Sequence, residues 1–128
     1  MMEFGLGLFP TEPPRSIVET TKLAEDLGYA HVWMGDSQLI WREVYVNLGA
    51  AGLATSRITL GQGVTNPITR HPTVTASALA TLSELTDGRV ALGIGAGDSA
   101  VETYGNRPAT LARLESTVTS IVGLLNGE

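Results

Sequence analysis

Short apolar runs alternate along the chain with longer segments in which apolar and polar residues follow a helical period. The first apolar run extends from Phe4 to Phe9. It is followed, from about Pro14 to Gly28, by a segment whose apolar residues recur at helical spacing. A period near 3.6 residues indicates an amphipathic helix, and glycine commonly ends one. This pair therefore predicts a strand followed by a helix.

The same alternation continues to the end of the chain, giving four strand–helix units in a row. Because the predicted strands are too apolar to leave one face in water, they indicate an α/β fold with a parallel sheet covered by helices. The remaining expected strands are His31–Gly35, Ile58–Val64 and Arg89–Gly95, and the remaining expected helices are Val44–Thr55, Thr73–Leu85 and Ala109–Leu125.

Two architectures fit such a series: a doubly wound open sheet and part of a (βα)8 barrel. A doubly wound dinucleotide-binding sheet normally has a glycine-rich, phosphate-binding turn directly after its first strand. Residues 9 to 14 read FPTEPP and contain no glycine. The glycines lie instead at the ends of the third and fourth expected strands. The pattern alone leaves both architectures open.

The carboxyl ends of the expected strands carry small and polar residues. In both architectures these ends open onto the ligand site. Glycine there lets a flat ligand approach the backbone, but it also relieves crowding where strands bend. Spacing does not separate the two interpretations. The segments concerned are Gly35–Ser37, Gly63–Asn66 and Gly95–Ser99.

Composition limits the classes of partner. With 128 residues and 43% hydrophobic content, the chain is sized for a single domain, 1–128. A net charge of -5, with 8 scattered Lys and Arg residues, argues against a nucleic-acid partner. No apolar run approaches the roughly 18 residues that a membrane span needs. The chain has no cysteine, and His31 and His71 are too far apart for a metal site. We expect a cytoplasmic protein without a metal.

Three segments resemble the luciferase-like monooxygenase superfamily, and within it the deazaflavin-dependent branch that includes methylenetetrahydromethanopterin reductase. They read LAEDLGYAHVWMGD, SRITLGQGVTNPITRHPTVTASALATLSELTDGR and VALGIGAGDSAVETYG. The resemblance implies a (βα)8 TIM barrel of which this chain would be the amino-terminal half. A half-barrel leaves two sheet edges without partners, which favours a homo-oligomer or other self-association.

The resemblance also implies a set of site residues. Gly63 and Val64, followed by Thr65, occupy the place of a non-prolyl cis peptide that supports the deazaflavin ring. Asp36 matches an acid close to the ring, although it could instead brace the loop that follows. Ser37 replaces a catalytic histidine of some deazaflavin dehydrogenases, and a hydroxyl is a poor base near neutral pH.

The loop Gly95–Ala96–Gly97–Asp98 matches one that lines the ring of the cofactor. The resemblance makes Asp98 a candidate proton donor or substrate anchor, a role that requires partial burial to raise the pKa of its carboxyl group. The alternative is a turn residue that caps a helix together with Ser99. The site is therefore expected to combine catalytic Asp98, Asp36 and Ser37 with a cofactor-binding backbone.

The implied activity is hydride transfer between coenzyme F420 and a small organic substrate. The alternative cofactor is FMN, in a monooxygenase of the same superfamily. An alternative of another class is an inactive half-barrel that needs a partner to complete the barrel.

Several residues outside the expected site also have predicted roles. Trp33 is expected in the core, and Trp41 is a candidate wall of the cofactor pocket. Arg89 and Arg107 are expected to be solvated surface residues, and His71 is expected to shape its loop.

Overall fold

A computed structural model describes residues 2–128 and confirms the predicted parallel sheet. The strands are hydrogen-bonded in the order β1-β2-β3-β4, and each pair is parallel. A doubly wound sheet reverses its strand order about the first strand, whereas a barrel wall adds its strands in sequence. The observed order is that of a barrel wall. The strands are β1 (Gly5–Leu8), β2 (His31–Met34), β3 (Thr59–Thr65) and β4 (Val90–Ile94).

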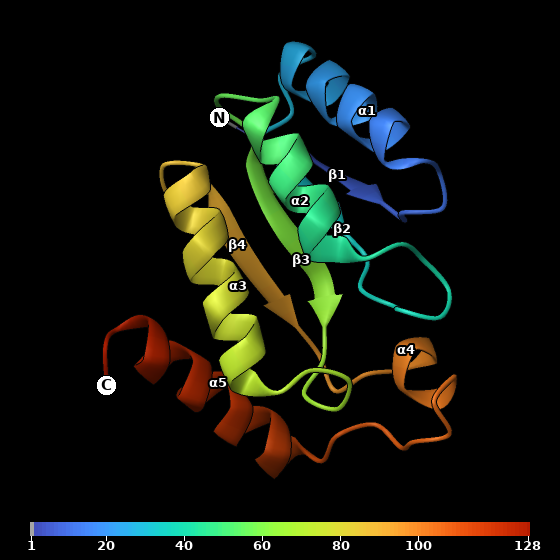
Figure 1. The fold of residues 1–128 in the computed structure, drawn as a ribbon, viewed down its shortest axis with the longest axis vertical. Helices are drawn as coiled ribbons and strands as arrows, with labels where there is room; N and C mark the ends of the chain where they lie inside the picture. Colours follow the sequence, from blue (N-terminus) through green and yellow to red (C-terminus); the bar gives the residue numbers. More distant parts are fainter. Residues whose placement is uncertain (1) are drawn as a thin grey trace.

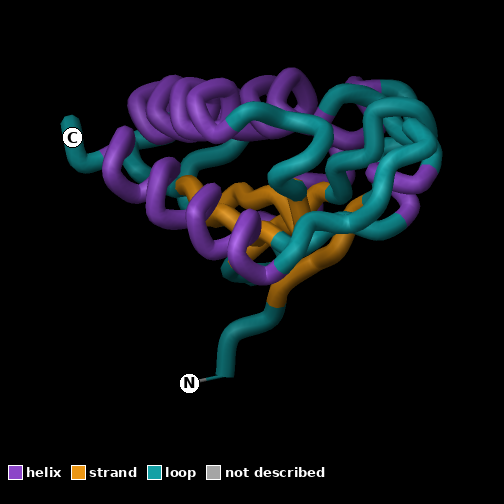
Figure 2. The backbone as a smooth tube through the Cα atoms, turned by 90° about the horizontal axis from the view of Figure 1, so that it is seen from below, coloured by secondary structure: helices purple, strands orange, loops and turns teal. Residues whose placement is uncertain are grey.

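The helices follow the strands as the periodicity predicts, with ends shifted by a few residues. Figure 1 shows α2 and α3 in front of the sheet, with α5 below α3, and Figure 2 shows most helical turns along one side of the strands. The pattern missed α4, because four residues are too few to show a helical period. The helices are α1 (Pro14–Asp26), α2 (Val44–Leu53), α3 (Pro72–Leu85), α4 (Ser99–Glu102) and α5 (Leu111–Leu125).

The hydrophobic core lies between the sheet and the helices. Alternate residues of each strand face the helices, as the period of two in a strand requires. One cluster joins the first three strands to α1 and α2 and includes Val32, Leu48 and Leu60. A second cluster joins β4 to α3 and α5 around Leu79 and Ile121. This packing fixes the helix-covered face and leaves the other set of alternate residues on the inner face of the sheet.

The inner face is built mostly of glycine, and Trp33 lies across it. The expectation that Trp33 belongs to the core was wrong: Trp33 is half-buried on this face, in register with Gly7 and Gly61. A Cβ atom at Gly61 would lie 2.6 Å from Cζ3 of Trp33 and 2.8 Å from the carbonyl oxygen of Ala91. At Gly61, therefore, glycine relieves crowding rather than admitting a ligand.

Arg89 was expected to be a solvated surface residue, and the structure corrects this. Its guanidinium donates hydrogen bonds to the carbonyl oxygens of Ile58 at 2.8 Å, Thr55 at 3.0 Å and Gly52 at 3.1 Å. The last carbonyl groups of a helix lack partners within the helix, and basic side chains can satisfy them. Arg89 thus ties the end of α2 to the starts of β3 and β4.

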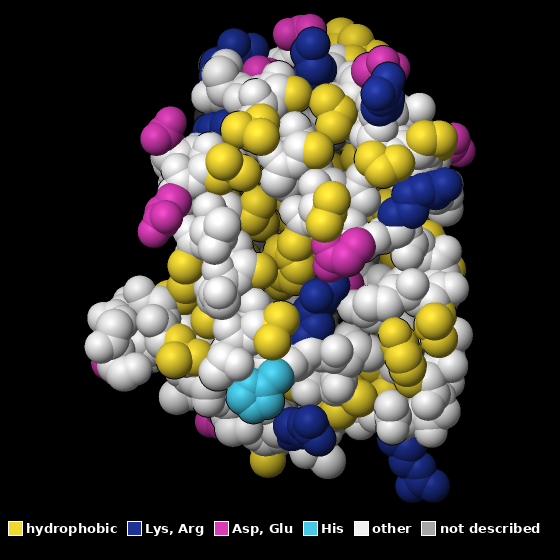
Figure 3. Space-filling view, viewed as in Figure 1, with side chains coloured by type: hydrophobic (Ala, Val, Ile, Leu, Met, Phe, Trp, Pro, Cys, Tyr) yellow, Lys and Arg dark blue, Asp and Glu magenta, His cyan; other side chains and the backbone are white. Residues whose placement is uncertain are grey.

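The helix-covered surface in Figure 3 carries charges of both signs among scattered hydrophobic side chains. Within residues 2–128, no helix has the length and apolar content that crossing a bilayer demands. Strands β1 and β4 lie at the two edges of the sheet. Self-association through these edges stays a prediction.

Two glycine substitutions on the inner face, one at a crowded position and one at an open position, test this packing. A Cβ atom at Gly93 would lie 2.5 Å from the backbone carbonyl oxygen of Gln62, whereas one at Gly7 would have no neighbour within 4 Å. We expect Gly93→Ala to lower the free energy of unfolding by about 1–3 kcal/mol, because the backbone of β3 must move. Gly7→Ala should change it by less than about 0.5 kcal/mol. Urea unfolding followed by circular dichroism measures both, and equal losses would contradict the packing described.

Candidate functional site

The carboxyl ends of all four strands surround one cavity of about 380 Å³. Every site residue expected from the sequence lines it, although this placement alone does not test their roles. Phe9, Trp41 and Asn66 also contribute. The lining segments are Gly35–Ser37 after β2, Gly63–Asn66 at the end of β3 and Gly95–Ala100 after β4.

The third strand supplies one wall of the cavity through its backbone. The peptide bond between Gly63 and Val64 is cis, as the resemblance implied. The Val64 side chain is 51% exposed and lies over β4, where Cβ atoms at Gly93 and Gly95 would each come within 3.3 Å of its methyl groups. The wall therefore presents peptide groups of β3 and the apolar Val64 side chain.

Asp36 lies at the end of β2 and is 3% exposed. Its carboxylate accepts hydrogen bonds from the hydroxyl group of Thr65 at 2.7 Å and from the side-chain amide of Gln38 at 2.8 Å. It also accepts two from Arg70, at 2.8 Å from Nε and 3.0 Å from a terminal nitrogen. This arrangement favours the bracing interpretation, because all of these partners belong to the protein. Contact between Asp36 and a cofactor stays a prediction.

Arg70 is the residue of this network that sequence reasoning missed. Besides Asp36, its guanidinium pairs with Glu43 at 2.6 Å and lies 4.7 Å from the centre of the Tyr45 ring. Burial by itself lowers the pKa of Arg70, but hydrogen bonds to Asp36 and Glu43 and their charges raise it above its ordinary value. Burial raises the pKa of Tyr45 to about 12. The sequence did contain a signal for this ion pair. Asp36 follows β2 and Arg70 follows β3, and loops after neighbouring parallel strands lie at the same end of the sheet.

The loop after β4 places Asp98 at the mouth of the cavity. Asp98 is exposed, and its backbone carbonyl accepts hydrogen bonds from the amides of Val101 and Glu102, both at 2.9 Å. Ser99 donates its hydroxyl to the Asp98 carboxylate at 3.1 Å. Asp98 thus occupies the helix-cap position of α4, the alternative role. The described residues do not bury it, so its role as a proton donor stays a prediction that requires cover from a bound ligand.

Two aromatic rings form the wall beside β1 and β2. The rings of Phe9 and Trp41 lie 4.9 Å apart, and Trp41 packs directly over Gly35, where a Cβ atom would clash with it. The carbonyl oxygen of Ser37 accepts hydrogen bonds from the amides of Ile40 at 3.0 Å and Trp41 at 2.8 Å. Ser37 therefore shapes the turn that carries Trp41 to the cavity. Trp41 lines the pocket, as its position suggested.

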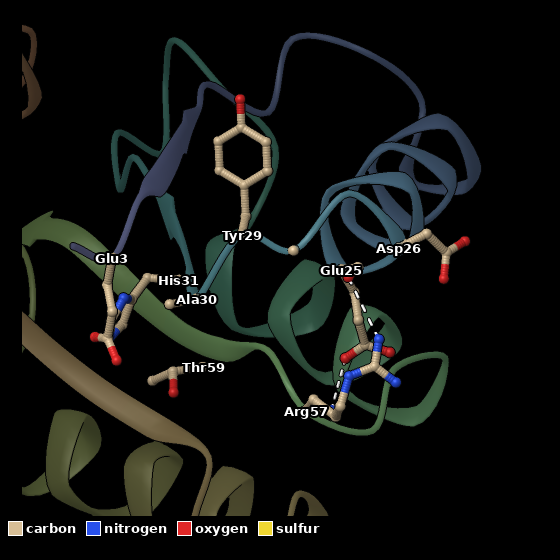
Figure 4. A pocket seen from close by; sticks show the side chains of 9 residues that line it. Glu3, Glu25, Asp26, Tyr29, Ala30, His31, Arg57 and Thr59 are labelled. Atoms are coloured by element: carbon tan, nitrogen blue, oxygen red, sulfur yellow. Dashed lines mark hydrogen bonds between the residues drawn. The ribbon is translucent and has the colours of Figure 1, made fainter. Parts of the chain in front are cut away.

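A second pocket of about 400 Å³ lies at the opposite, amino ends of the strands (Figure 4). Glu25 points into it, but its carboxylate accepts hydrogen bonds from the backbone amides of Ser56 at 3.0 Å, Arg57 at 2.6 Å and Ile58 at 2.8 Å. Glu25 therefore fixes the turn before β3. His31 is also at this end. Chemistry in parallel α/β folds occurs at the other end, so we assign this pocket a structural role.

Within residues 2–128, no three histidine or acidic side chains gather as a metal centre would need. His71 instead caps α3, because its Nδ1 accepts a hydrogen bond from the amide of Thr73 at 3.3 Å.

Comparisons with known proteins agree with this geometry. Residues 2–128 match the family model described as luciferase-like monooxygenase. The 5,10-methylenetetrahydromethanopterin reductase of Methanopyrus kandleri is 42% identical over 77% of this chain and 28% of its own. The reductase of the same name from Methanolobus tindarius is 37% identical over 99% of this chain and 39% of its own.

The structural comparison points the same way. The solved structure of the coenzyme F420-dependent tetrahydromethanopterin reductase from Methanopyrus kandleri superposes with a TM-score of 0.83 at 30% identity. The match covers 96% of this chain and 39% of that one. The chain thus spans well under half the length of these relatives.

The ion pair predicts a large effect from Arg70→Met. The substitution removes the cation next to the Asp36 carboxylate, whose side chain is 1% exposed. We expect the free energy of unfolding to fall by about 3 kcal/mol, because an unpaired buried charge remains. Arg107→Met, at an exposed position, is the control. Adding Asp36→Asn to Arg70→Met should recover part of the loss. Urea unfolding of the four proteins measures this, and an Arg70→Met variant as stable as Arg107→Met would contradict the assignment.

Glu25 predicts a pH dependence of stability. Burial alone raises the pKa of Glu25, but hydrogen bonds from the amides of Ile58, Arg57 and Ser56 hold it below the ordinary value of 4.5. A carboxyl group with a lowered pKa in the folded state stabilises the fold fully above pH 4.5. That contribution is lost as the pH falls through the lowered value.

Urea midpoints measured from pH 7 to pH 3 should therefore fall less steeply in Glu25→Gln than in the wild type. Glu19→Gln, at an exposed position of α1, should follow the wild-type curve. Parallel curves for Glu25→Gln and the wild type would refute the role of Glu25.

Proposed function

The chain belongs to the luciferase-like monooxygenase family, and we propose that it carries the cofactor-facing part of a deazaflavin-dependent oxidoreductase. The proposed reaction is hydride transfer between coenzyme F420 and a small organic substrate. Its most concrete form is a reduction at a carbon–nitrogen bond, like that of the methylenetetrahydromethanopterin reductases. The observation that carries the proposal is the single cavity onto which the strand ends Asp36–Ser37, Gly63–Thr65 and Gly95–Asp98 converge.

The cavity suits a planar ring system. Its volume of about 380 Å³ lies within the roughly 300–1,000 Å³ of small-molecule pockets. Backbone from Gly63 to Thr65 and from Gly95 to Asp98 would hold the ring, and the aromatic pair of Phe9 and Trp41 would close one side. Small residues and peptide groups leave room for a flat ligand and offer hydrogen-bonding atoms at its edges. When bound, the deazaflavin supplies the carbon atom that donates or accepts the hydride.

The chain's own residues contribute orientation and exclusion of water. Val64 presents an apolar surface to the cavity, and Trp41 shields the side next to β2. Positioning of this kind supplies much of the rate in reactions where the cofactor carries the chemistry. Asp98, at the mouth, would act on the substrate as a proton donor or anchor once a ligand covers it. Asp36 would act through Thr65, whose hydroxyl group it holds.

Two residues bear on the substrate class. Ser37 lies where some deazaflavin dehydrogenases carry a catalytic histidine. A hydroxyl group can orient a ligand but is a poor base near neutral pH, which disfavours sugar-dehydrogenase chemistry of that type. Gly7 lies where the pterin reductases usually carry an acid in the first strand. The cofactor class therefore has stronger support than the exact pterin substrate.

The proposal predicts selective cofactor binding. Titration of the 128-residue chain with reduced coenzyme F420, followed by the fluorescence of the cofactor, should show saturable binding that is tighter than the binding of FMN. Ala96→Leu should abolish it, because the larger side chain fills the cavity that Ala96 lines. The matched control is Ala30→Leu, the same change in the pocket at the opposite end of the sheet, and it should leave binding unaltered.

Each other outcome points to a different conclusion. Tighter binding of FMN than of coenzyme F420 would favour the monooxygenase alternative. Binding of neither by the wild type at high micromolar concentration would contradict the proposal and favour a half-barrel that needs a partner. Loss of binding in Ala30→Leu but not in Ala96→Leu would place the site at the wrong end of the sheet.

A further inference from the structure

Trp33 packs against Gly63 on the inner face of the sheet, through its Cβ atom and through the near edge of its indole. A Cβ atom at Gly63 would lie 2.9 Å from Cβ of Trp33, and its next nearest atoms, at 3.6 Å, also belong to Trp33. Gly63 lines the cavity, but Trp33 does not. Trp33 therefore lies one layer below the wall that Gly63 and Val64 provide.

The three atoms nearest to a Cβ atom at Gly63 all belong to Trp33. The interior of a complete barrel is normally filled by layers of bulky branched side chains. Here most inner positions on the strands beside β2 are small, and within β2 the His31 ring stacks against Trp33 at 6.1 Å. A Cβ atom at Gly5 would lie 3.3 Å from the indole nitrogen of Trp33, and one at Gly61 would lie 2.6 Å from the other end of the ring. The indole thus spans from β1 to β3 across the inner face. The neighbouring inner positions are Gly5, Gly7, Gly61, Ala91 and Gly93.

We propose that Trp33 is a positioning residue of the site: it supports the Gly63–Val64 segment from below and sets how deeply a planar ring enters the cavity. The part that concerns a ring rests on the function proposed above. The part that concerns the segment is a property of the chain itself and holds with or without a ligand.

The physical basis is packing. Protein interiors are filled to the density of organic crystals, so removing a large side chain leaves space that neighbouring atoms fill only in part. Without the indole, Gly61 would face a void, and Gly63 would keep only the Cβ atom of residue 33 beside it. Glycine also has more backbone freedom than any other residue. The segment would then move toward the barrel interior. A ring resting on it would shift as well, and displacements of about 1 Å can reduce catalysis about 100-fold.

Amide hydrogen exchange tests the support without any ligand. The amide of Gly95 donates to the carbonyl oxygen of Thr65 at 3.0 Å and so reports on the segment. The amide of Thr59, which donates to Ala30 at 2.9 Å at the far end of β3, is the internal reference. Trp33→Ala should raise the ratio of the Gly95 rate to the Thr59 rate at least about tenfold, because the segment near Gly63 loses the indole, whereas the amide of Thr59 is held by its bond to the backbone before β2. Trp33→Phe should keep the wild-type ratio.

The matched control is Leu60→Ala. Leu60 is in the same strand and 1% exposed, but it faces the helices, so its truncation destabilises the protein without opening the inner face. The ratio should therefore stay at the wild-type value in Leu60→Ala. Trp33→Leu replaces Trp33→Ala if the alanine variant does not fold. A ratio within about twofold of the wild type in the truncated Trp33 variant would overturn the proposal.

Titration with reduced coenzyme F420 tests the ligand part. Trp33→Ala should weaken binding at least about tenfold, and Trp33→Phe and Leu60→Ala less than about threefold. A raised exchange ratio with unchanged affinity would overturn the claim that Trp33 sets the depth of the ring. If the wild type binds no coenzyme F420, the proposed function fails, and the exchange ratio still decides whether Trp33 supports the segment.

Discussion

The ion pair between Asp36 and Arg70 holds the ligand end of this fold together. Parallel strands bring their loops to one end of the sheet, but nothing in strand pairing fixes how those loops lie. Asp36 ends β2, Arg70 precedes α3, and the guanidinium also reaches Glu43 at the start of α2. Because the Asp36 carboxylate is buried, it needs all of its hydrogen-bond donors. One of them is Thr65, so the same carboxylate that binds Arg70 also fixes the end of β3 beside the cavity.

The limited space on the inner face of the sheet is a second constraint, because several positions there have no room for a side chain. Glycines on β3 and β4 pack against two side chains: Trp33 packs against Gly61 and Gly63, and Val64 packs against Gly93 and Gly95. The sequence left two explanations open for these small residues: relief of crowding and close approach of a ligand. Different glycines fit different explanations. At Gly61 and Gly93 they relieve crowding, since a Cβ atom would meet an indole or a carbonyl oxygen. The backbone of Gly63 and Gly95 lines the cavity, and it is there that close approach of a ligand remains the proposal.

The two ends of the sheet illustrate how similar cavities can differ in use. Both pockets are close to 400 Å³. At the amino end Glu25, one of three acids that line the pocket, is engaged by three backbone amides of one turn. At the carboxyl end Asp98 is exposed, and peptide groups and an apolar side chain form the walls. Volume does not distinguish these sites. The make-up of their walls does: charged side chains surround the pocket at the amino end, whereas small residues, aromatic rings and the Val64 side chain line much of the cavity at the carboxyl end.

The sequence by itself determined the order of strands and helices, the parallel sheet and the segments that line the cavity. These follow from local periodicity and from the rule that parallel strands share a ligand end, so they need no knowledge of distant contacts. It missed α4, which is too short to show a period. Only the tertiary structure decided the partners of Arg70 and Arg89 and the face on which Trp33 lies. Those depend on residues about thirty positions apart meeting across neighbouring units, and no local pattern encodes such a meeting.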